Sequence, residues 1–373
     1  MALWLLGNLG YINPHLVRLE GKEQSNSGRS LYEEARSRGY LIKTPEGLDY
    51  KVRLGVFESG MIDLFKPEAR LWLKSIIKEQ LLGIGLSGWM CDFSESLPSD
   101  ASFADGRSGS YLHNLYVEEW AKLNQEAIEE AGVRDDAVFF CRAGYTRSPR
   151  YARFFWQGDQ MVSWDRFDGL RSAVVGLIGG GISGYSLNHS DIGGYANLNV
   201  GSLGIVRDKE LLARWEEFSA FTAAFRTHEG LRPEANAQVY DDEESLTPFA
   251  RNARLFKSLQ PYRKILFQEA EAKGYPVVRA LFLQYHDDPK AYELDDEFML
   301  GSEILVAPIL EKKARAREVY LPKGQWVHVW SRKTYGSPDQ PTELSIAAPI
   351  GEPPVFVRAG SQQGEEWLKT LDR

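Results

Sequence analysis

The chain has 373 residues, of which 43% are hydrophobic and 26% charged, so it can bury a large core and has the composition of an ordinary globular protein. Its formal net charge of −8 argues against a nucleic-acid-binding groove, and no apolar run is long enough to span a membrane. The two cysteines, Cys91 and Cys141, provide neither a disulfide framework nor metal-ligand spacing. We expect two buried free thiols and, because the first apolar residues follow no basic segment, a cytoplasmic location.

Strands and helices alternate through the first half of the sequence. Residues 5–12 predict a strand that ends at Asn13-Pro14, and Thr44-Pro-Glu-Gly47 predicts a hairpin turn. Pro67 predicts the start of a helix, whose buried face is expected to contain Leu71, Leu73, Ile76, Ile77 and Leu81. Further strands are predicted over 85–93, 137–143 and 154–158, and an amphipathic helix over 111–131.

The same alternation continues to about residue 282. Helices are predicted over 167–178, 210–226 and 246–272, and strands over 184–190 and 277–282. This order predicts a parallel sheet covered by helices. Polar residues gather at the carboxyl ends of the strands, which favours a (β/α)8 TIM-type barrel over a doubly wound sheet. Because about six strands are predicted where such a barrel has eight, we expect an α/β fold with an N-terminally incomplete barrel.

The pattern changes after about residue 300. Short apolar segments separated by Gly and Pro turns predict strands over 304–308, 318–321, 326–330 and 355–358. They predict a small antiparallel β-sandwich domain. We therefore divide the chain into a barrel domain, 1–295, and a C-terminal β-domain, 296–373.

Two aspartates close apolar runs that the pattern predicts to be strands. Asp92 ends Gly88-Trp-Met-Cys-Asp92, and Asp159 ends Trp156-Gln-Gly-Asp159. Hydrolysis of a glycosidic bond requires one ionised carboxylate and one proton donor. We assign Asp92 as the nucleophile and Asp159, whose aromatic neighbours are expected to raise its pKa, as the general acid/base. The alternatives are a strand-end cap for Asp92 and a simple turn for Asp159.

Three further polar residues lie in predicted loops near strand ends. Arg142 is expected to keep Asp92 ionised or to bind a sugar hydroxyl, with a structural ion pair as the alternative. His228, in Arg226-Thr-His-Glu-Gly230, has a substrate role or a purely structural one. Tyr195 offers a hydroxyl beside Gly193-Gly194, a pair that permits a tight loop around substrate.

Cofactor motifs are missing from the sequence. There is no P-loop, no Gly-x-Gly-x-x-Gly after a strand and no His-x-x-x-His, and no lysine follows Gly179-Gly-Gly181. We expect neither a cofactor nor a metal.

These motifs resemble those of glycoside hydrolase family 31, the retaining α-glycosidases. Trp89-Met-Cys-Asp92-Phe-Ser-Glu95 is similar to the family's nucleophile motif, with one extra residue between Trp and Asp. Arg142 to Ser148 followed by Trp156-Gln-Gly-Asp159 is similar to its acid/base stretch, and Ser190-Asp-Ile-Gly-Gly-Tyr195 and Arg226-Thr-His228 follow in family order. The resemblance implies Asp92 as the nucleophile, Asp159 as the acid/base, and substrate-binding roles for Arg142, His228, Tyr195, Glu95, Trp156 and Asp191.

Within the family, the sequence is most similar to the enzymes that hydrolyse α-sulfoquinovosides. The similar segments are Trp89 to Pro98, Arg142 to Tyr145, His189 to Tyr195, Arg226 to Gly230 and Ala348 to Phe356. The resemblance implies that Arg142 and His228 hold sugar hydroxyls and that Tyr195 takes part in sulfonate recognition. It also implies that an N-terminal β-sandwich and two barrel strands precede this region in the family, with an Arg and a Trp that grip the sulfonate.

We therefore expect a retaining α-glycoside hydrolase for an anionic small-molecule substrate, an α-sulfoquinovoside, with its two carboxyl groups about 5–5.5 Å apart. One alternative is a neutral-sugar α-glucosidase or α-xylosidase of the same family. The other is a non-catalytic fragment that binds carbohydrate or a partner chain. A homo-oligomer is compatible with the sequence, and nucleic-acid and membrane partners are not expected.

Overall fold

The computed structural model describes residues 7–18, 28–54, 57–200 and 203–371. Two compact units make up the chain: Met1–Phe155, called unit 1, and Trp156–Arg373, called unit 2. None of the helices in the described ranges has the length and apolarity that a membrane crossing requires. Cys91 and Cys141 are free and buried, as predicted.

Unit 1 combines a parallel sheet, a small antiparallel sheet and helices. Its elements are β1 (Asn8–Ile12), β2 (His15–Val17), α2 (Leu31–Ser37), β3 (Val52–Leu54), β4 (Phe57–Met61), α3 (Pro67–Ile76), the π-helix η1 (Ile77–Leu82), β5 (Leu86–Cys91), the 3-10 turn η2 (Ser94–Ser96), α4 (Gly109–Glu130), β6 (Val138–Cys141), α5 (Ser148–Tyr151) and β7 (Phe154–Trp156).

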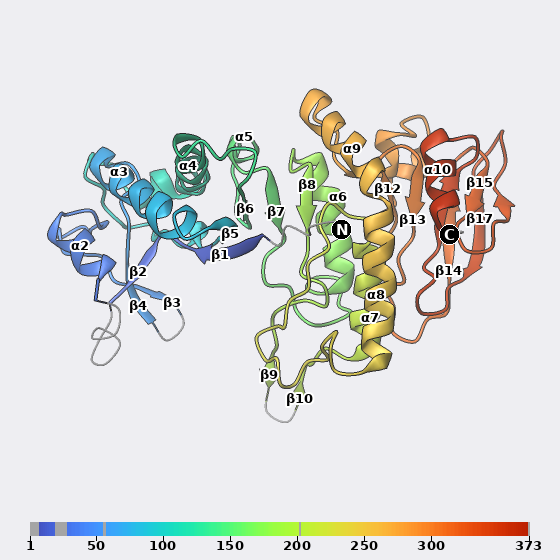
Figure 1. Cartoon of the computed structure of the whole chain (residues 1–373), viewed down its shortest axis with the longest axis horizontal. Coiled ribbons are helices and arrows are strands. Elements are labelled where there is room, and N and C mark those ends of the chain that lie inside the picture. The colour runs from blue at the N-terminus through green and yellow to red at the C-terminus, as the bar shows by residue number, and fades with distance from the viewer. Residues whose placement is uncertain (1–6, 19–27, 55–56, 201–202, 372–373) are drawn as a thin grey trace. The chain divides into compact units, whose positions relative to one another are not determined.

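The parallel sheet of unit 1 has the strand order β1-β5-β6-β7, and the order continues to β8 (Leu187–His189), which gives five strands. Strands β5 and β6 are paired in register, with Cys91 opposite Cys141. The residues that follow these two cysteines, Asp92 and Arg142, therefore leave the sheet as neighbours. Helices α3 and α4 pack beside one another in this unit (Figure 1).

The helix predicted from Pro67 forms as α3, but two residues expected on its buried face are not buried: Leu71 is exposed, and Leu81, which lies in η1, is half-buried. The buried apolar residues Ala69, Trp72, Leu73 and Ile76 follow the spacing of a single helix face. Leu71 is 63% exposed, because it lies two residues from Leu73 and so points to the opposite side of the helix.

Unit 2 contains helices followed by antiparallel sheets. Besides β8, its elements are α6 (Leu170–Ile182), β9 (Asn199–Val200), β10 (Leu203–Gly204), α7 (Lys209–Ser219), α8 (Glu243–Ser258), α9 (Gln260–Lys273), β11 (Val278–Arg279), the 3-10 turns η3 (Leu281–Leu283) and η4 (Pro289–Tyr292), β12 (Phe298–Leu300), β13 (Ile304–Val306), β14 (Ala316–Leu321), β15 (Trp326–His328), β16 (Thr334–Tyr335), β17 (Thr342–Ala347), β18 (Val355–Arg358) and α10 (Gln362–Leu371).

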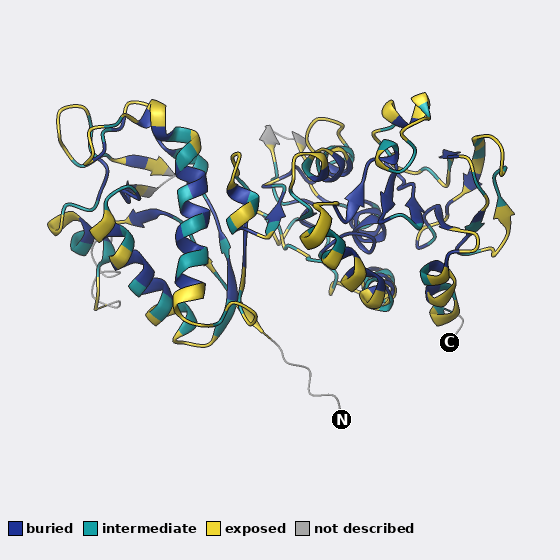
Figure 2. Ribbon diagram, turned by 90° about the horizontal axis from the view of Figure 1, so that it is seen from above, coloured by how far each residue is buried: buried dark blue, intermediate teal, exposed yellow. Residues whose placement is uncertain are grey.

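The predicted C-terminal strands are confirmed as β13, β14, β15 and β18. They lie in a six-stranded sheet of order β11-β12-β13-β18-β15-β16 and a two-stranded sheet of β14 and β17. Buried residues of these strands form one apolar cluster that includes Leu305, Trp326 and Phe356, and Figure 2 shows the buried strands of this region. The division at residue 295 stays a prediction.

Three expectations for unit 2 need correction. Residues 277–282 were predicted as a sixth parallel strand, but β11 pairs antiparallel with β12, with Val278 opposite Leu300. The apolar segment meets the antiparallel sheet instead, so the parallel sheet keeps five strands. The helix predicted over 210–226 ends at Ser219, and the helix predicted from 167 begins at Leu170, which leaves Phe167 82% exposed.

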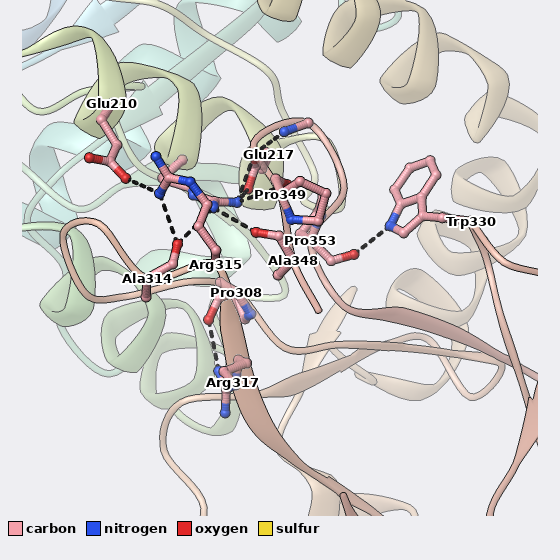
Figure 3. A network of polar contacts seen from close by, with 12 residues as sticks. Glu210, Glu217, Pro308, Ala314, Arg315, Arg317, Trp330, Ala348, Pro349 and Pro353 are labelled. Carbon is pink, nitrogen blue, oxygen red and sulfur yellow. Dashed lines mark hydrogen bonds and ion pairs between the residues drawn. The ribbon is translucent and has the colours of Figure 1, made fainter. Parts of the chain in front are cut away.

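Helix α7 is joined to the C-terminal loops by polar contacts (Figure 3). Glu217 accepts the Gly351 N–H at 2.5 Å, and the Arg214 guanidinium pairs with Glu217 at 2.8 Å. Arg214 also donates to the Ala348 carbonyl at 2.8 Å, and Arg315 pairs with Glu210 at 2.5 Å. Because Arg214 and Glu217 are almost fully buried, loss of one partner would leave the other as an unpaired buried charge.

Gly88 is required for the pairing of β5 with β6. A Cβ atom there would lie 1.8 Å from the Val138 carbonyl oxygen. We expect Gly88→Ala to lower the free energy of unfolding by about 3 kcal/mol or more, because the strand must move to remove the clash. The measurement is chemical denaturation followed by tryptophan fluorescence.

Gly132→Ala is the matched control, because Gly132 also has a positive φ, +71°, but its Cβ would meet nothing within 4 Å. It is expected to cost only about 1–2 kcal/mol, the price of a left-handed non-glycine residue. Equal destabilisation by the two substitutions would contradict the steric explanation.

Candidate active site

Asp92 lies directly after β5 and is 5% exposed. Its Oδ1 accepts the Phe93 N–H at 2.8 Å and pairs with Arg142 Nε at 2.9 Å. Its Oδ2 accepts the Tyr11 hydroxyl at 2.7 Å. Three donors from three chain segments therefore hold the carboxylate in one orientation.

Burial and hydrogen bonding act in opposite directions on this carboxyl group. Desolvation raises the pKa of Asp92, while the Tyr11 hydrogen bond, the Arg142 charge and the Phe93 N–H lower it. Desolvation and the bond to Asp92 also raise the pKa of the Tyr11 phenol, so Tyr11 remains a donor at neutral pH.

Arg142 connects Asp92 to Glu95. Its Nε and Nη2 lie 2.8 and 2.7 Å from Glu95 Oε1, and its guanidinium lies over the Phe93 ring at 4.4 Å. Phe93 has a left-handed backbone, with φ of +55°, which turns the chain sharply after Asp92. Asp92, Glu95 and Arg142, all predicted site residues, are thus brought together within unit 1.

Asp159 lies in unit 2, in the loop after β7, and is exposed. Gly158 before it has φ of +79°, a conformation that favours glycine. The carbonyl of the next residue, Gln160, accepts the N–H groups of Tyr195 and Ala196 at 2.8 and 2.9 Å. The backbone therefore ties the Tyr195 loop next to Asp159. Trp156, three residues earlier, is buried at the end of β7.

Asp191 follows β8 and is 1% exposed. It pairs with Arg226, which also donates from Nε to His189 Nε2 at 3.1 Å. Burial raises the pKa of Asp191 to about 6; the Arg226 charge opposes this rise, and the Asp159 charge adds to it. Asp191, Arg226 and Asp159 thus form one electrostatic cluster.

His228 packs edge-on against the Tyr195 ring, with centroids 4.8 Å apart. The Gly230 N–H donates to His228 Nδ1 at 3.0 Å, so Nδ1 is an acceptor and the proton of the neutral ring lies on Nε2. Burial lowers the pKa of His228, and the charges of Arg226 and Arg207 lower it further. His228 therefore offers a neutral N–H donor at pH 7.

The predicted site residues fall into two groups. Unit 1 holds Asp92, Glu95 and Arg142, and unit 2 holds Asp159, Asp191, Tyr195, His228 and Trp156. The pairing of Asp92 with Asp159 stays a prediction. Within the described residues, no cluster of three or more His, Cys, Asp or Glu is placed to hold a metal ion.

Two residues that contact the predicted site residues were not predicted from the sequence: Tyr11, which contacts Asp92, and Arg226, which contacts Asp191. Tyr11 stands near the end of a predicted strand, and Arg226 begins the motif that contains His228. Position at a strand end was the available signal for Tyr11. The parallel bridge between Ile192 and Thr227, which brings Arg226 beside the β8 loop, could not be read from the pattern.

Comparison with known proteins gives consistent matches along the chain. The family model described as the glycosyl hydrolases family 31 TIM-barrel domain matches residues 10–262, and that of the glycosyl hydrolase family 31 C-terminal domain matches residues 274–361. A sulfoquinovosidase of Escherichia coli K12 is 43% identical over 95% of this chain and 50% of its own length. A sulfoquinovosidase of Agrobacterium fabrum C58 is 39% identical over 97% of this chain and 53% of its own length.

A solved structure agrees with these matches. It is that of a GH31 family sulfoquinovosidase from E. rectale in complex with the aza-sugar inhibitor IFGSQ, and it superposes with a TM-score of 0.89 at 40% identity, over 97% of this chain and 52% of that one. The chain spans about half the length of the curated relatives it matches. The matches cover both predicted domains, and on this ground the chain belongs to glycoside hydrolase family 31.

Proposed function

We propose that this chain carries the catalytic machinery of a retaining α-glycosidase that hydrolyses α-sulfoquinovosides. The observation that carries the proposal is its 43% identity, over 95% of its length, to a protein named sulfoquinovosidase. The Asp92 site supports it, because a buried carboxylate held by Arg142, Tyr11 and a backbone N–H suits a fixed nucleophile.

In the proposed first step, a carboxylate oxygen of Asp92 attacks the anomeric carbon, and the bond from that carbon to the leaving oxygen breaks. Asp159 gives its proton to the leaving oxygen, so the alcohol departs neutral and the sugar is left as an ester of Asp92. In the second step Asp159 takes a proton from water, and the water oxygen displaces Asp92. The exposed position of Asp159 suits a group that exchanges protons with water.

The donors around Asp92 have a role in both steps. Arg142 and the Phe93 N–H occupy Oδ1, while Oδ2 carries only the Tyr11 hydrogen bond among the described contacts. We assign Oδ2 as the attacking oxygen for this reason. The same donors stabilise the carboxylate when it leaves in the second step.

Substrate contacts are assigned residue by residue. We propose that Arg142 and His228 hold sugar hydroxyls, His228 through its Nε2–H, and that Glu95, Trp156 and Asp191 complete the sugar pocket. Tyr195 is assigned to the sulfonate, which stays anionic and prefers strong hydrogen-bond donors. The edge contact between the Tyr195 and His228 rings supports a shared task for these two residues.

The two carboxylate roles can be separated by substitution. Asp92→Asn is expected to abolish turnover of aryl α-sulfoquinovoside, because the amide cannot form the glycosyl ester. Asp159→Ala is expected to slow substrates with poor leaving groups by about 10²–10⁴-fold, the usual contribution of general acid catalysis, and activated aryl substrates far less.

Added azide gives the control for these assignments. It should restore turnover by Asp159→Ala, because azide attacks the glycosyl ester in place of water. The product should be a sugar azide of unchanged anomeric configuration. Wild-type turnover by Asp92→Asn, or an inverted azide from Asp159→Ala, would remove the assignment.

Tyr11→Phe is expected to change the pH dependence of kcat/KM. The Tyr11 hydrogen bond lowers the pKa of Asp92, so its removal lets that pKa rise. Because the nucleophile must be ionised, the acidic limb of the profile should move to higher pH. Tyr50→Phe removes a similar bond, to Asp100 at 2.7 Å, and should leave the profile unchanged. An unmoved acidic limb in Tyr11→Phe would contradict the role of Tyr11.

Tyr195→Phe tests the substrate class. We expect KM for aryl α-sulfoquinovoside to rise about 10- to 100-fold, the value of one hydrogen bond to a charged group, while kcat changes less. Activity on aryl α-glucoside, which lacks the sulfonate, should not fall in parallel. If the wild-type chain prefers the glucoside, the neutral-sugar alternative is correct.

A further inference from the structure

Arg207 is a buried cation in unit 2 that no catalytic assignment uses. It lies between β10 and α7 and is 2% exposed. The acceptors of its guanidinium hydrogen bonds are neutral: one is the side-chain oxygen of Gln238, at 3.0 Å, and the others are backbone carbonyls. A buried guanidinium that binds carbonyls links segments of chain rather than neutralising one acid.

The carbonyls belong to three segments of the chain, at residues 192–194, 228–229 and 237. From the loop after β8, the Ile192 and Gly194 carbonyls each accept from Nη1 at 3.4 Å. From the loop that contains His228, the carbonyl of His228 itself accepts from Nη1 at 2.8 Å. The Ala237 carbonyl accepts from Nε at 2.8 Å, and the Glu229 carbonyl accepts from Nη2 at 3.3 Å.

Gly193 shows that the loop after β8 is shaped around this side chain. Its φ is +87°, and a Cβ atom at this position would lie 2.4 Å from Arg207 Cδ. The first glycine of Gly193-Gly194 therefore admits Arg207. The expectation that the pair permits a tight loop around substrate stays a prediction.

Burying a charge without a directly bonded carboxylate costs free energy, so a residue that does so needs a compensating role. Burial lowers the pKa of Arg207 to about 10, which still leaves it charged at neutral pH. All five donors of a guanidinium project in a fixed plane, a geometry that can hold several carbonyls at once and that a lysine lacks.

We infer that Arg207 is a positioning residue, which fixes the loop after β8 against the loop of His228 and so sets the places of Asp191, Tyr195 and His228. Its effect on turnover rests on the proposed function, whereas its effect on the two loops does not.

The charge of Arg207 also reaches the groups that it positions. For Asp191, burial raises the pKa, Arg226 and Arg207 lower it, and Asp159 raises it. For His228, burial, Arg226 and Arg207 lower the pKa, while Asp159 and Glu229 raise it. Removal of the Arg207 charge should therefore raise the pKa of His228. Removal of a residue that only filled space would leave this pKa unchanged.

The test compares Arg207→Met and Arg207→Lys with a control, Arg263→Met. Arg263, in α9, is 4% exposed and its pKa is also lowered to about 10 by burial, and it donates to the Phe256 carbonyl. Hydrogen–deuterium exchange of the full chain is measured for peptides over 190–196 and 226–231. These contain the amides of Ile192 and Leu231, which bond to the Arg226 and Tyr195 carbonyls at 3.0 and 2.9 Å.

We expect Arg207→Met to lose exchange protection in both peptides and Arg263→Met to keep it. Arg207→Lys, which retains the charge, should lose part of the protection and keeps the test valid if Arg207→Met does not fold. With aryl α-sulfoquinovoside, kcat/KM of Arg207→Met should fall about 100-fold, the cost of a small misplacement of catalytic groups. The pKa of His228, followed by NMR, should rise in Arg207→Met.

Unchanged protection in both peptides of Arg207→Met and Arg207→Lys overturns the inference, as does equal loss in Arg263→Met. If the wild-type chain does not turn over the sulfoquinovoside, the proposed function fails, and the exchange and NMR results still decide the role of Arg207.

Discussion

Unit 1 is organised around the Asp92 carboxyl group, which is almost fully removed from water and is held by three hydrogen-bond donors. The in-register pairing of β5 with β6 delivers Asp92 and Arg142 to the same sheet edge, where their side chains meet at 2.9 Å. The adjacent strand β1 adds Tyr11, and the left-handed turn at Phe93 adds a backbone N–H. Each donor offsets part of the desolvation cost, so the surrounding backbone has little freedom to change.

In unit 2, Asp159, Asp191 and His228 lie in loops between the helices and strands. The loops after β7 and β8 and the loop of His228 are joined by isolated backbone bridges, Met161 with Ala196 and Ile192 with Thr227, and by specific side chains. Arg226 holds Asp191 from one loop, and Arg207 holds the carbonyls of two loops. Buried cations thus add to the backbone bridges that join these loops. The polar contacts of α7 with the C-terminal loops extend the same strategy to the β-domain.

The differences between expectation and structure have physical causes. Leu71 was placed inward because it is apolar, yet helix geometry puts it opposite Leu73 and it lies in solvent. Residues 277–282 have the apolar character of a barrel strand, but strand direction depends on the partner, and β12 pairs antiparallel with β11. Tyr11 was overlooked because its distance to Asp92 along the chain is 81 residues and only sheet register brings them together.

The sequence by itself determined the alternation of strands and helices, the change to short antiparallel strands after residue 300, and the family, because local periodicity and motif order are properties of neighbouring residues. It also placed Asp92 and Arg142 at strand ends, where parallel pairing made their meeting predictable. Only the tertiary structure decided which carbonyls Arg207 binds, which ring nitrogen of His228 carries the proton and why residue 193 is a glycine. These depend on contacts between loops that are distant in sequence and have no repeating pattern, so no local signal encodes them.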